Sequence, residues 1–420
     1  MMVDSDALAT YLEKVHKKGV LPKMVPQDAE VYNLLKRDTE AVVVGKKAYR
    51  APIWVRTGGF FRAANFDGST SLGPGNAGKR EEYTASPYEF TLAKELSLEV
   101  EYHTNDKQKA IENVVESEME DASKGMATCL DILAMQSGNG ILGAVTAGNA
   151  TTSVTVDDAR LFYPGMAVTS YTANQGVQRA TAGGATDVEV VEVDVHNNVL
   201  TLSVAFDAQI VGDVICLGGL VGAKPVTVGG IPYWHNGAAT GLVGGLDRAT
   251  YKSIRTPNIT AGSQLTPSHG YQLLTKMRRQ RGKESIKKGF WLGSMTSWAG
   301  VAESVTQVQE IDGPADGATV PDTGYDIESE GRFCGRKFHQ CTHYPDTRLE
   351  YFVPGAWGKL IVEDVGFLKI GKNIIFPRYS TTDGYPMSAY VFYLRWEGAY
   401  MCFDTSTGGY IGSLVKPAGY

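Results

Sequence analysis

The sequence predicts an α+β fold with an all-β domain inserted into it. Residues 51–102 contain two segments with the alternating polarity of strands, separated by a loop rich in glycine and serine. Residues 105–136 repeat apolar side chains every three or four positions, as an amphipathic helix does. Residues 150–220 contain five short strand-like segments separated by turn residues. With 420 residues, the chain is long enough for roughly two or three domains.

The composition is that of an ordinary folded, mildly acidic protein. Hydrophobic residues make up 43% of the chain, charged residues 20%, and the net charge is −6, so nucleic acid is not expected to be the main ligand. The five cysteines have no regular spacing, which favours free thiols in a reducing compartment. We find neither an apolar signal segment at the start nor a run of 18 apolar residues, and we expect no contact with a membrane.

Residues 1–50 are predicted to form an extended arm that begins with a short helix. Asp4 and Ser5 can cap a first helical turn, and the apolar residues that follow have helical spacing: Leu8, Tyr11, Leu12 and Val15. The segment "VLPKMVPQDAEVYNLLKRDTEAVVV" contains prolines and has weak periodicity. We therefore expect an arm with little core of its own.

Residues 51–102 are predicted to form a long hairpin. The segments "APIWVRTGGFFRAANF" and "YEFTLAKELSLEVEYH" flank the loop "DGSTSLGPGNAGKREE". In the second segment, apolar residues occupy most even positions from Phe90 to Tyr102 and polar residues occupy most odd ones, so one face should be buried. Two strands cannot form a stable domain alone, and the hairpin must lie against something else.

Residues 103–145 are predicted to contain one long helix. Its apolar positions are spaced by three or four residues: Ile111, Val115, Met119, Ala122, Met126, Cys129 and Leu133. At 1.5 Å per residue the helix would be about 45 Å long, too long for one small core to bury. We expect it to end at "SGNGILGAVTAGN", interpreted as a linker. Gly138, Gly140 and Gly143 fit G-x-G-x-x-G, but they follow a helix and precede strands, the reverse of a dinucleotide site.

The rest of the chain divides into three predicted parts. Residues 146–222 should form a small β-barrel or sandwich, and residues 223–380 a mixed α/β domain. In the latter, "TPSHGYQLLTKMRRQRGKE" should be a helix with Tyr271, Leu274 and Met277 on its apolar face. Its basic run is expected to be a solvated face or a subunit contact: Lys276, Arg278, Arg279, Arg281, Lys283, Lys287 and Lys288. Residues 381–420 contain "SAYVFYLRWEGAYMCFD", a strand with large residues on both faces.

The stretch "FCGRKFHQCTHYPD" contains Cys334, His339, Cys341 and His343, which are ligand types that zinc selects. It has no C-x-x-C pair, and read as one strand it places Cys334 on the face opposite the other three. A bulge at Gly335 would bring all four together. We expect packed side chains in a buried strand and no metal site.

Sequence motifs of catalysis are absent. There is no G-x-S-x-G, no H-E-x-x-H and no Walker loop, and no nucleophile, base and oxyanion donor share a recognisable context. We therefore predict that the protein is not an enzyme and uses no cofactor.

The order of these elements resembles that of the major capsid proteins of tailed bacteriophages, which share the Hong Kong ninety-seven capsid fold. The likeness spans most of residues 50–405 and lies in layout more than in any short motif. The segments that carry it are "RTGGFFRAANFDGSTSLGPGNAGKREEYTASPYEFTLAKELSLEVEY", "DKQKAIENVVESEMEDASKGMATCLDILA", "GLDRATY", "FWLGSMTSWAGVAESV" and "VFYLRWEGAYMCFDT".

The resemblance implies a role for each part of the chain. The parts would be an N-terminal arm (1–50), an E-loop hairpin (51–102), the spine helix of a peripheral domain (103–145), an inserted β domain (146–222), an axial domain (223–380) and a returning peripheral strand (381–420). The protein would assemble in the bacterial cytoplasm, as hexamers and pentamers, into the virion shell around double-stranded DNA contacted non-specifically. A separate scaffolding protein, a portal and a cement protein would be further partners.

Subunit contacts are expected at the hairpin and at the arm. The hairpin residues are Phe60, Phe61 and Phe66 as apolar anchors, and Arg62, Lys79, Arg80, Glu81 and Glu82 as ion-pair partners. The arm residues are Leu8, Tyr11, Leu12 and Val15. Two alternatives remain at this stage: a surface-layer or extracellular β-rich protein that binds a ligand through the inserted domain, and a cytosolic metalloenzyme that uses the Cys/His cluster.

Overall fold

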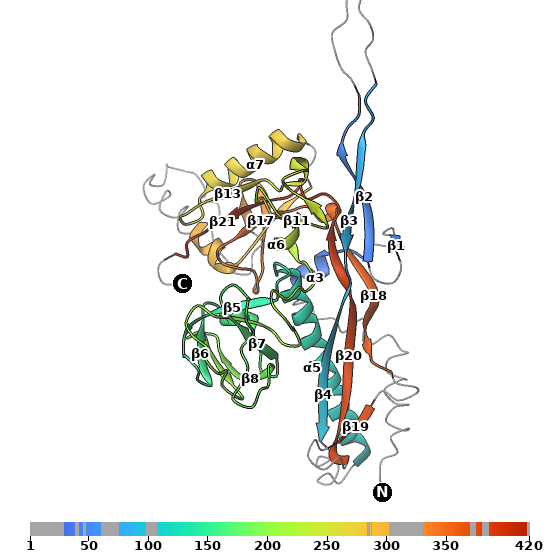
Figure 1. Ribbon diagram of the computed structural model, residues 1–420, viewed down its shortest axis with the longest axis vertical. Helices are drawn as coiled ribbons and strands as arrows, with labels where there is room; N and C mark the ends of the chain where they lie inside the picture. Colours follow the sequence, from blue (N-terminus) through green and yellow to red (C-terminus); the bar gives the residue numbers. More distant parts are fainter. Residues whose placement is uncertain are drawn as a thin grey trace, which may run out of the picture.

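The computed structural model describes residues 29–37, 42–44, 48–59, 75–97, 107–283, 286, 288–301, 331–369, 375–379 and 386–417. The described chain consists of a long sheet with a helix beside it, an α/β domain, and a small β-barrel (Figure 1). A narrow hairpin extends beyond the long sheet, away from the barrel (Figure 1).

The hairpin is built from different strands than we expected. Strand β2 (Ala48–Arg56) pairs with β3 (Lys79–Ala85), and β1 (Val42–Val44) pairs with the other edge of β2. The assignment of residues 88–102 as the returning strand is therefore wrong, because β3 lies in and just after what we read as loop. The chain leaves the hairpin at Pro87, whose nitrogen has no hydrogen to donate to a ladder.

Strand β4 (Tyr88–Ser97) instead joins a four-stranded sheet centred on β20 (Pro386–Cys402). On its other side, β20 pairs with β18 (Trp357–Phe367) and β19 (Ile375–Tyr379). The alternation predicted for β4 is present, with Phe90 and Leu92 half-buried. Among the β20 residues whose burial is described, those from Gly398 to Cys402 are buried on both faces, whereas residues 389–397 alternate between buried and half-buried positions.

The long helix α5 (Lys107–Ala134) is present as predicted. Of its expected apolar positions, Met119, Ala122, Met126 and Leu133 are buried. They contribute to a core shared with the four-stranded sheet, the hairpin base and the short helices α3 (Glu30–Leu34) and α6 (Ile231–Trp234).

The inserted domain is a closed six-stranded barrel. Its strands are β5 (Ile141–Ala147), β6 (Ser153–Val156), β7 (Ala167–Tyr171), β8 (Val188–Asp194), β9 (Val199–Leu202) and β10 (Val214–Leu217), with the 3-10 turn η1 (Ala159–Leu161) between β6 and β7. The interpretation of "SGNGILGAVTAGN" as a linker is wrong, since β5 begins five residues before the expected boundary. Closure requires β5, because it pairs with β10 on one side and β6 on the other.

The α/β domain is organised around a six-stranded sheet. The strand order is β13 (Asn258–Thr260), β21 (Gly409–Gly412), β17 (Leu349–Phe352), β14 (Phe290–Gly293), β16 (Arg336–Gln340) and β15 (Arg332–Phe333). Smaller elements are β11 (Leu242–Val243), β12 (Leu246–Asp247) and the 3-10 turns η2 (Lys252–Ile254) and η3 (Pro354–Ala356). The expected helix is α7 (Pro267–Arg281). Its buried face contains Leu273 and Met277, whereas Tyr271 is 60% exposed, so the predicted apolar face is wrong at Tyr271.

The chain passes between the two sheets more often than we predicted. Strands β18 and β19 lie within residues 223–380, yet they pair with β20 in the long sheet. Strand β21 follows β20 in the sequence but pairs with β13 and β17 in the α/β domain. Strand pairing over such separations depends on tertiary contacts that local pattern does not reveal.

Candidate subunit-contact surface

The predicted contact residues fall into two groups. Phe60, Phe61, Arg62 and Phe66 of the hairpin, and Leu8, Tyr11, Leu12 and Val15 of the arm, lie outside the described residues. Lys79, Arg80, Glu81 and Glu82 are consecutive on β3, so neighbouring members of the set point to opposite faces of the hairpin.

Lys79 and Glu81 share one face, where they contact the α/β domain of the same chain. Lys79 Nζ lies 2.8 Å from Glu81 Oε1 and donates a hydrogen bond of 2.8 Å to the Tyr251 hydroxyl. That hydroxyl donates to Glu81 Oε1 at 2.6 Å. The hydrogen bonds from Lys79 and Tyr251 lower the pKa of Glu81 below its ordinary value, so the carboxylate stays charged at neutral pH. This triangle ties the hairpin to the residue before η2.

Arg80 and Glu82 use the other face and contact strand β2. The Arg80 guanidinium lies 4.1 Å from the ring centroid of Trp54, and Glu82 pairs with Arg50 at 3.5 Å. Trp54 is 58% exposed, which is unusual for a side chain with so much apolar area. Our sequence analysis did not single out Trp54, although its place opposite Arg80 makes it a further candidate contact residue.

The base of the hairpin is held by a buried aromatic contact. Tyr83 is 1% exposed and packs edge-on against Trp234 of α6, with ring centroids 5.5 Å apart. Its hydroxyl lies 3.0 Å from Thr405 Oγ1, just after β20. Gly244 is adjacent, and a Cβ there would come within 2.7 Å of both rings. Sequence reasoning missed Tyr83, since nothing local distinguishes it from the other tyrosines.

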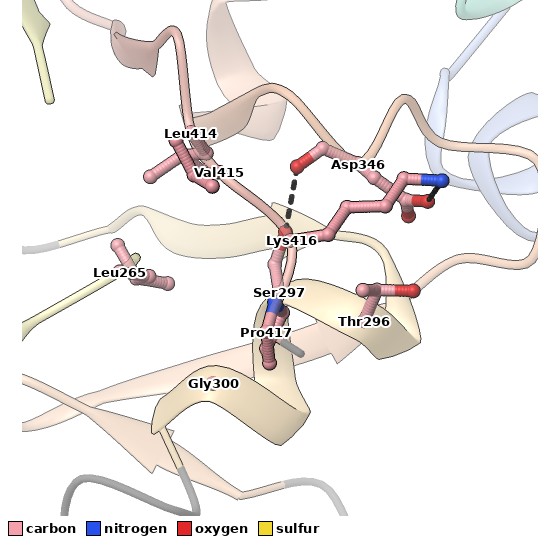
Figure 2. Close-up of a pocket in the computed structure, with 9 residues that line it drawn as sticks. All are labelled: Leu265, Thr296, Ser297, Gly300, Asp346, Leu414, Val415, Lys416 and Pro417. Atoms are coloured by element: carbon pink, nitrogen blue, oxygen red, sulfur yellow. Dashed lines mark hydrogen bonds and ion pairs between the residues drawn. The ribbon is translucent and has the colours of Figure 1, made fainter. Parts of the chain in front are cut away.

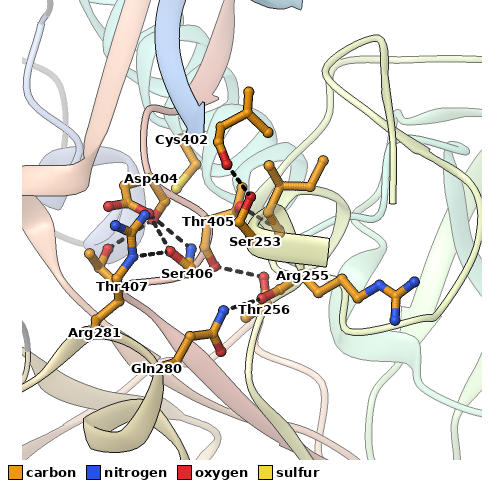
Figure 3. Close-up of polar contacts among 12 residues, drawn as sticks. Ser253, Arg255, Thr256, Gln280, Arg281, Cys402, Asp404, Thr405, Ser406 and Thr407 are labelled. Atoms are coloured by element: carbon orange, nitrogen blue, oxygen red, sulfur yellow. Dashed lines mark hydrogen bonds and ion pairs between the residues drawn. The ribbon is translucent and has the colours of Figure 1, made fainter. Parts of the chain in front are cut away.

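A polar network connects this base to α7 (Figure 3). Asp404 accepts from Arg281 Nη2 at 2.8 Å and from Ser406 Oγ at 2.6 Å. Thr405 Oγ1 donates to the backbone oxygen of Ile254 at 2.6 Å, and Ser253 Oγ donates to that of Val55 at 3.2 Å. Hairpin, η2, α7 and the end of β20 are therefore joined at one point, which orients the hairpin relative to the body.

The first described part of the arm, which contains α3, is fastened to α5 in a similar way. The carboxylate of Asp131, 1% exposed, accepts hydrogen bonds from the backbone of Val31 at 2.8 Å and Tyr32 at 2.9 Å. His343 Nδ1 lies 3.5 Å from its other oxygen. Burial raises the pKa of the neighbouring Glu30. The charge of the nearby Asp131 carboxylate raises the pKa of this partly buried glutamate further, so Glu30 is the group at this joint whose proton is held more tightly than usual.

The Cys/His stretch is a tight hairpin and not the single strand that we predicted. Strands β15 and β16 are joined at Cys334 and Gly335, with φ of 48° and 75°, values that suit a two-residue hairpin turn. His339 packs edge-on against Phe290, and Cys341 begins a turn after β16. Within the described residues, no group of three or more His, Cys, Asp or Glu is placed to hold a metal ion. The metalloenzyme alternative therefore gains no support from the structure.

One buried constellation resembles catalytic chemistry but has no access to substrate. Cys402 Sγ lies 4.0 Å from His235 Nε2, and His235 Nδ1 lies 3.2 Å from Glu350 Oε2. All three residues are fully buried, and burial raises the pKa of the Cys402 thiol well above its ordinary value. Arg348 pairs with Glu350 at 2.5 Å and donates to the His235 backbone oxygen. The cluster is suited to holding α6, β17 and β20 together, and not to nucleophilic attack.

The barrel is joined to the α/β domain through Asp346. This carboxylate lies 3.0 Å from Arg160 of η1 and 3.0 Å from Lys416 near the C-terminus. Burial alone would raise its pKa, but a hydrogen bond from Ser294 and the charges of Arg160 and Lys416 lower it overall. The cavity beside it, which Ser297 also lines, has a volume of about 10 Å³ and room for at most one water molecule (Figure 2). It is a joint and not a ligand pocket.

Comparison with known proteins assigns the architecture. No family profile and no curated protein matches the sequence. A chain in the cyanophage A-1(L) capsid asymmetric unit matches in structure with a TM-score of 0.50 at 9% identity, over 92% of this chain and 93% of that one. The capsid of a native GTA particle matches with a TM-score of 0.46 at 9% identity, over 93% of this chain and 91% of that one. The capsid of Myoviridae phage XM1 matches with a TM-score of 0.41 at 9% identity, over 92% of each chain.

The first of these matches confirms the α+β capsid fold that the resemblance implied. Within the described residues, no helix is long and apolar enough to cross a membrane. The extracellular or surface-layer alternative gains no support from these comparisons.

Proposed function

We propose that this chain, whose fold is that of a chain in the cyanophage A-1(L) capsid, is a major capsid protein. It would self-assemble into the icosahedral head shell of a tailed double-stranded DNA bacteriophage. The observation that carries the proposal is the shared fold over nearly the whole length of both chains. The projecting hairpin adds to it, since beyond its buried base an extended two-stranded ribbon needs a partner surface to be stable.

The proposed mechanism is geometric. The described part of the hairpin is joined at its base by Tyr83, Tyr251 and the network around Asp404, so it projects from the body in a defined direction. Contacts to the next subunit would come from Phe60, Phe61, Arg62 and Phe66, and also from Trp54 and Arg80 on β2 and β3. Many such contacts, each modest, add up over a closed shell.

The partners follow from this role. Copies of the chain would form hexamers and pentamers, with a separate scaffolding protein, a portal and a cement protein joining them. The packaged DNA would be contacted non-specifically, the shell would be assembled in the bacterial cytoplasm, and the protein would have no enzymatic activity. The buried, neutral thiol of Cys402 supports the last point for the cluster of Cys402, His235 and Glu350.

The test is to express the chain alone and together with its neighbouring structural genes, and to examine particles by sedimentation and electron microscopy. We expect closed shells. A Phe60→Ser/Phe61→Ser variant should remain folded by circular dichroism but fail to form them. Val177→Ser serves as the control, since Val177 is exposed and lies between β7 and β8 of the barrel, and the barrel lies away from the hairpin (Figure 1). A chain that stays monomeric or dimeric under all these conditions would contradict the proposal.

A further inference from the structure

The negative charge of the protein is concentrated in the barrel. Residues 141–217 contain eight acidic residues but only two arginines and no lysine, a net charge of −6. The whole chain also has a net charge of −6, so the remaining residues carry 38 acidic and 38 basic side chains. The barrel alone therefore accounts for the acidity of the protein.

Both barrel arginines already have acidic partners. Arg160 pairs with Asp158 at 2.5 Å and with Asp346 at 3.0 Å, and Arg179 pairs with Asp213 at 2.9 Å. The six acidic residues left over are exposed: Asp157, Asp187, Glu189, Glu192, Asp194 and Asp207. Four of these six lie on or beside β8.

We call this surface the β8 face: Asp187, Glu189, Val191, Glu192, Asp194 and Val195. Val191 is 53% exposed and Val195 51%, so the face combines apolar area with negative charge. Asp187 and Asp194 accept hydrogen bonds from nearby groups of the barrel. Within the part of the chain that the structure describes, Glu189 and Glu192 have no basic partner.

The complementary surface lies on α7. Residues 276–288 contain seven basic residues and one acidic residue. Arg281 pairs with Asp404 at 2.8 Å, and Lys276 donates to the Asn258 backbone oxygen. Arg278 and Arg279 are exposed and have no acidic partner among the described residues. Tyr271 is 60% exposed and lies two turns earlier on the same side, so this face too is partly apolar.

The two surfaces cannot meet within one chain. In Figure 1, α7 lies on the far side of the α/β domain from the barrel, and β8 lies on the side of the barrel that faces away from that domain. We propose that the β8 face of one copy docks onto α7 of a second copy. This proposal rests on the proposed function for its setting, a shell in which such a head-to-tail contact can close.

A second copy explains both surfaces at once. A nucleic acid bound at α7 would account for the basic residues but would leave the β8 face without a partner, and DNA would repel it. In a homo-assembly every basic surface is matched by one acidic surface, and the pairing removes charge that would otherwise make the subunits repel one another. Opposite charge also favours fast and correctly oriented association.

The experiment is a charge swap in the full-length protein, with self-association followed by sedimentation velocity at low and high salt. Glu189→Lys/Glu192→Lys and Arg278→Glu/Arg279→Glu should each weaken self-association by roughly tenfold or more, equivalent to about 1.4 kcal/mol. The four substitutions together should restore it, because the charges are again opposite. Asp207→Lys, an exposed acidic residue of the barrel outside the β8 face, should have little effect.

Several results would overturn the proposal. One is that neither pair weakens association while circular dichroism shows both variants folded. Another is that the variant with all four substitutions does not regain self-association. A third is that Arg278→Glu/Arg279→Glu only releases nucleic acid from otherwise normal particles. If all the charge-swap variants still form closed shells normally, the proposed contact is wrong and the proposed function stands. If the swaps weaken self-association and the four substitutions together restore it, but no closed shells form, the contact stands and the proposed function is wrong.

Discussion

Single residues in this molecule act through their backbone conformation and their burial more than through chemical reactivity. Cys334 is an example, because its side chain suggested a ligand while its backbone, at a φ of 48°, shows a turn. Cys341 is another, since burial raises the pKa of its thiol and keeps it neutral. In both cases the residue type alone suggested a metal ligand, whereas the local environment indicates a structural role.

The turn interpretation of Cys334 can be tested directly. Asparagine adopts positive φ more readily than other residues with a side chain, and Asn-Gly is the preferred pair in such a hairpin. We expect Cys334→Asn to keep the fold and to change the free energy of unfolding by less than about 1 kcal/mol, in the stabilising direction. Chemical denaturation measures this, with Cys334→Val as the β-branched control that should destabilise. Loss of folding or of bound zinc in Cys334→Asn would speak for a ligand after all.

At the scale of elements, the hairpin is defined as much by its base as by its strands. Strand β3 contributes Tyr83 to the core and Lys79 and Glu81 to the surface of the α/β domain, so its alternate residues perform different tasks. An extended two-stranded ribbon is only marginally stable alone, and these tertiary contacts give it a direction.

Removing one hydroxyl should loosen the hairpin without unfolding the protein. Tyr251→Phe keeps the ring but loses the hydrogen bonds to Lys79 and Glu81. We expect hydrogen exchange of residues 79–85 to become several-fold faster, with little change in melting temperature, because exposed ion pairs contribute little to global stability. Tyr271→Phe on α7 is the matched control. Unchanged exchange in β3 would show that Tyr83 and β2 suffice to hold it.

At the scale of the whole molecule, a few polar joints add to the apolar core that the long sheet, the hairpin base and the α/β domain share. Asp346 joins the barrel, the six-stranded sheet and the C-terminal segment. The Asp404 network joins the hairpin to α7, and Asp131 joins α3 to α5. Each of these joints is centred on a carboxylate that links elements distant in the sequence.

Asp346→Asn should weaken the joint of the barrel in a pH-dependent manner. We expect the free energy of unfolding to fall by about 1–3 kcal/mol at neutral pH, because Arg160 and Lys416 lose the carboxylate with which both pair. The pKa of Asp346 is lowered in the folded protein, so its stabilisation is present above the ordinary value of 3.8 and is lost as the pH falls below it. Chemical denaturation at neutral pH and at about pH 3 should therefore show the difference between wild type and variant shrinking in acid.

Lys416→Met is the control for this measurement. The Lys416 side chain is 42% exposed, so its removal should cost less than that of Asp346. A difference between wild type and Asp346→Asn that stays constant with pH would contradict the role given to the carboxylate.

Much of the fold can be predicted from periodicity. The apolar spacing from Met119 to Leu133 indicates α5 and its buried face, because a helix that packs along one side must repeat near 3.6 residues. The alternation from Phe90 to Glu95 likewise identifies β4 and its half-buried side. The charged face of α7 and the presence of a separate barrel also follow from composition and turn residues.

Strand partners and joints required the tertiary structure. Nothing near Tyr88 indicates that β4 pairs with β20 some 300 residues later, nor that β3 lies within an apparent loop. The same holds for Tyr83, Asp131 and Asp346, whose importance comes from groups distant in the sequence. Periodicity records which side of an element is buried, since that is a local constraint on each side chain. It does not record what covers that side, since the partner is selected by packing and hydrogen bonds formed only when the whole chain has folded.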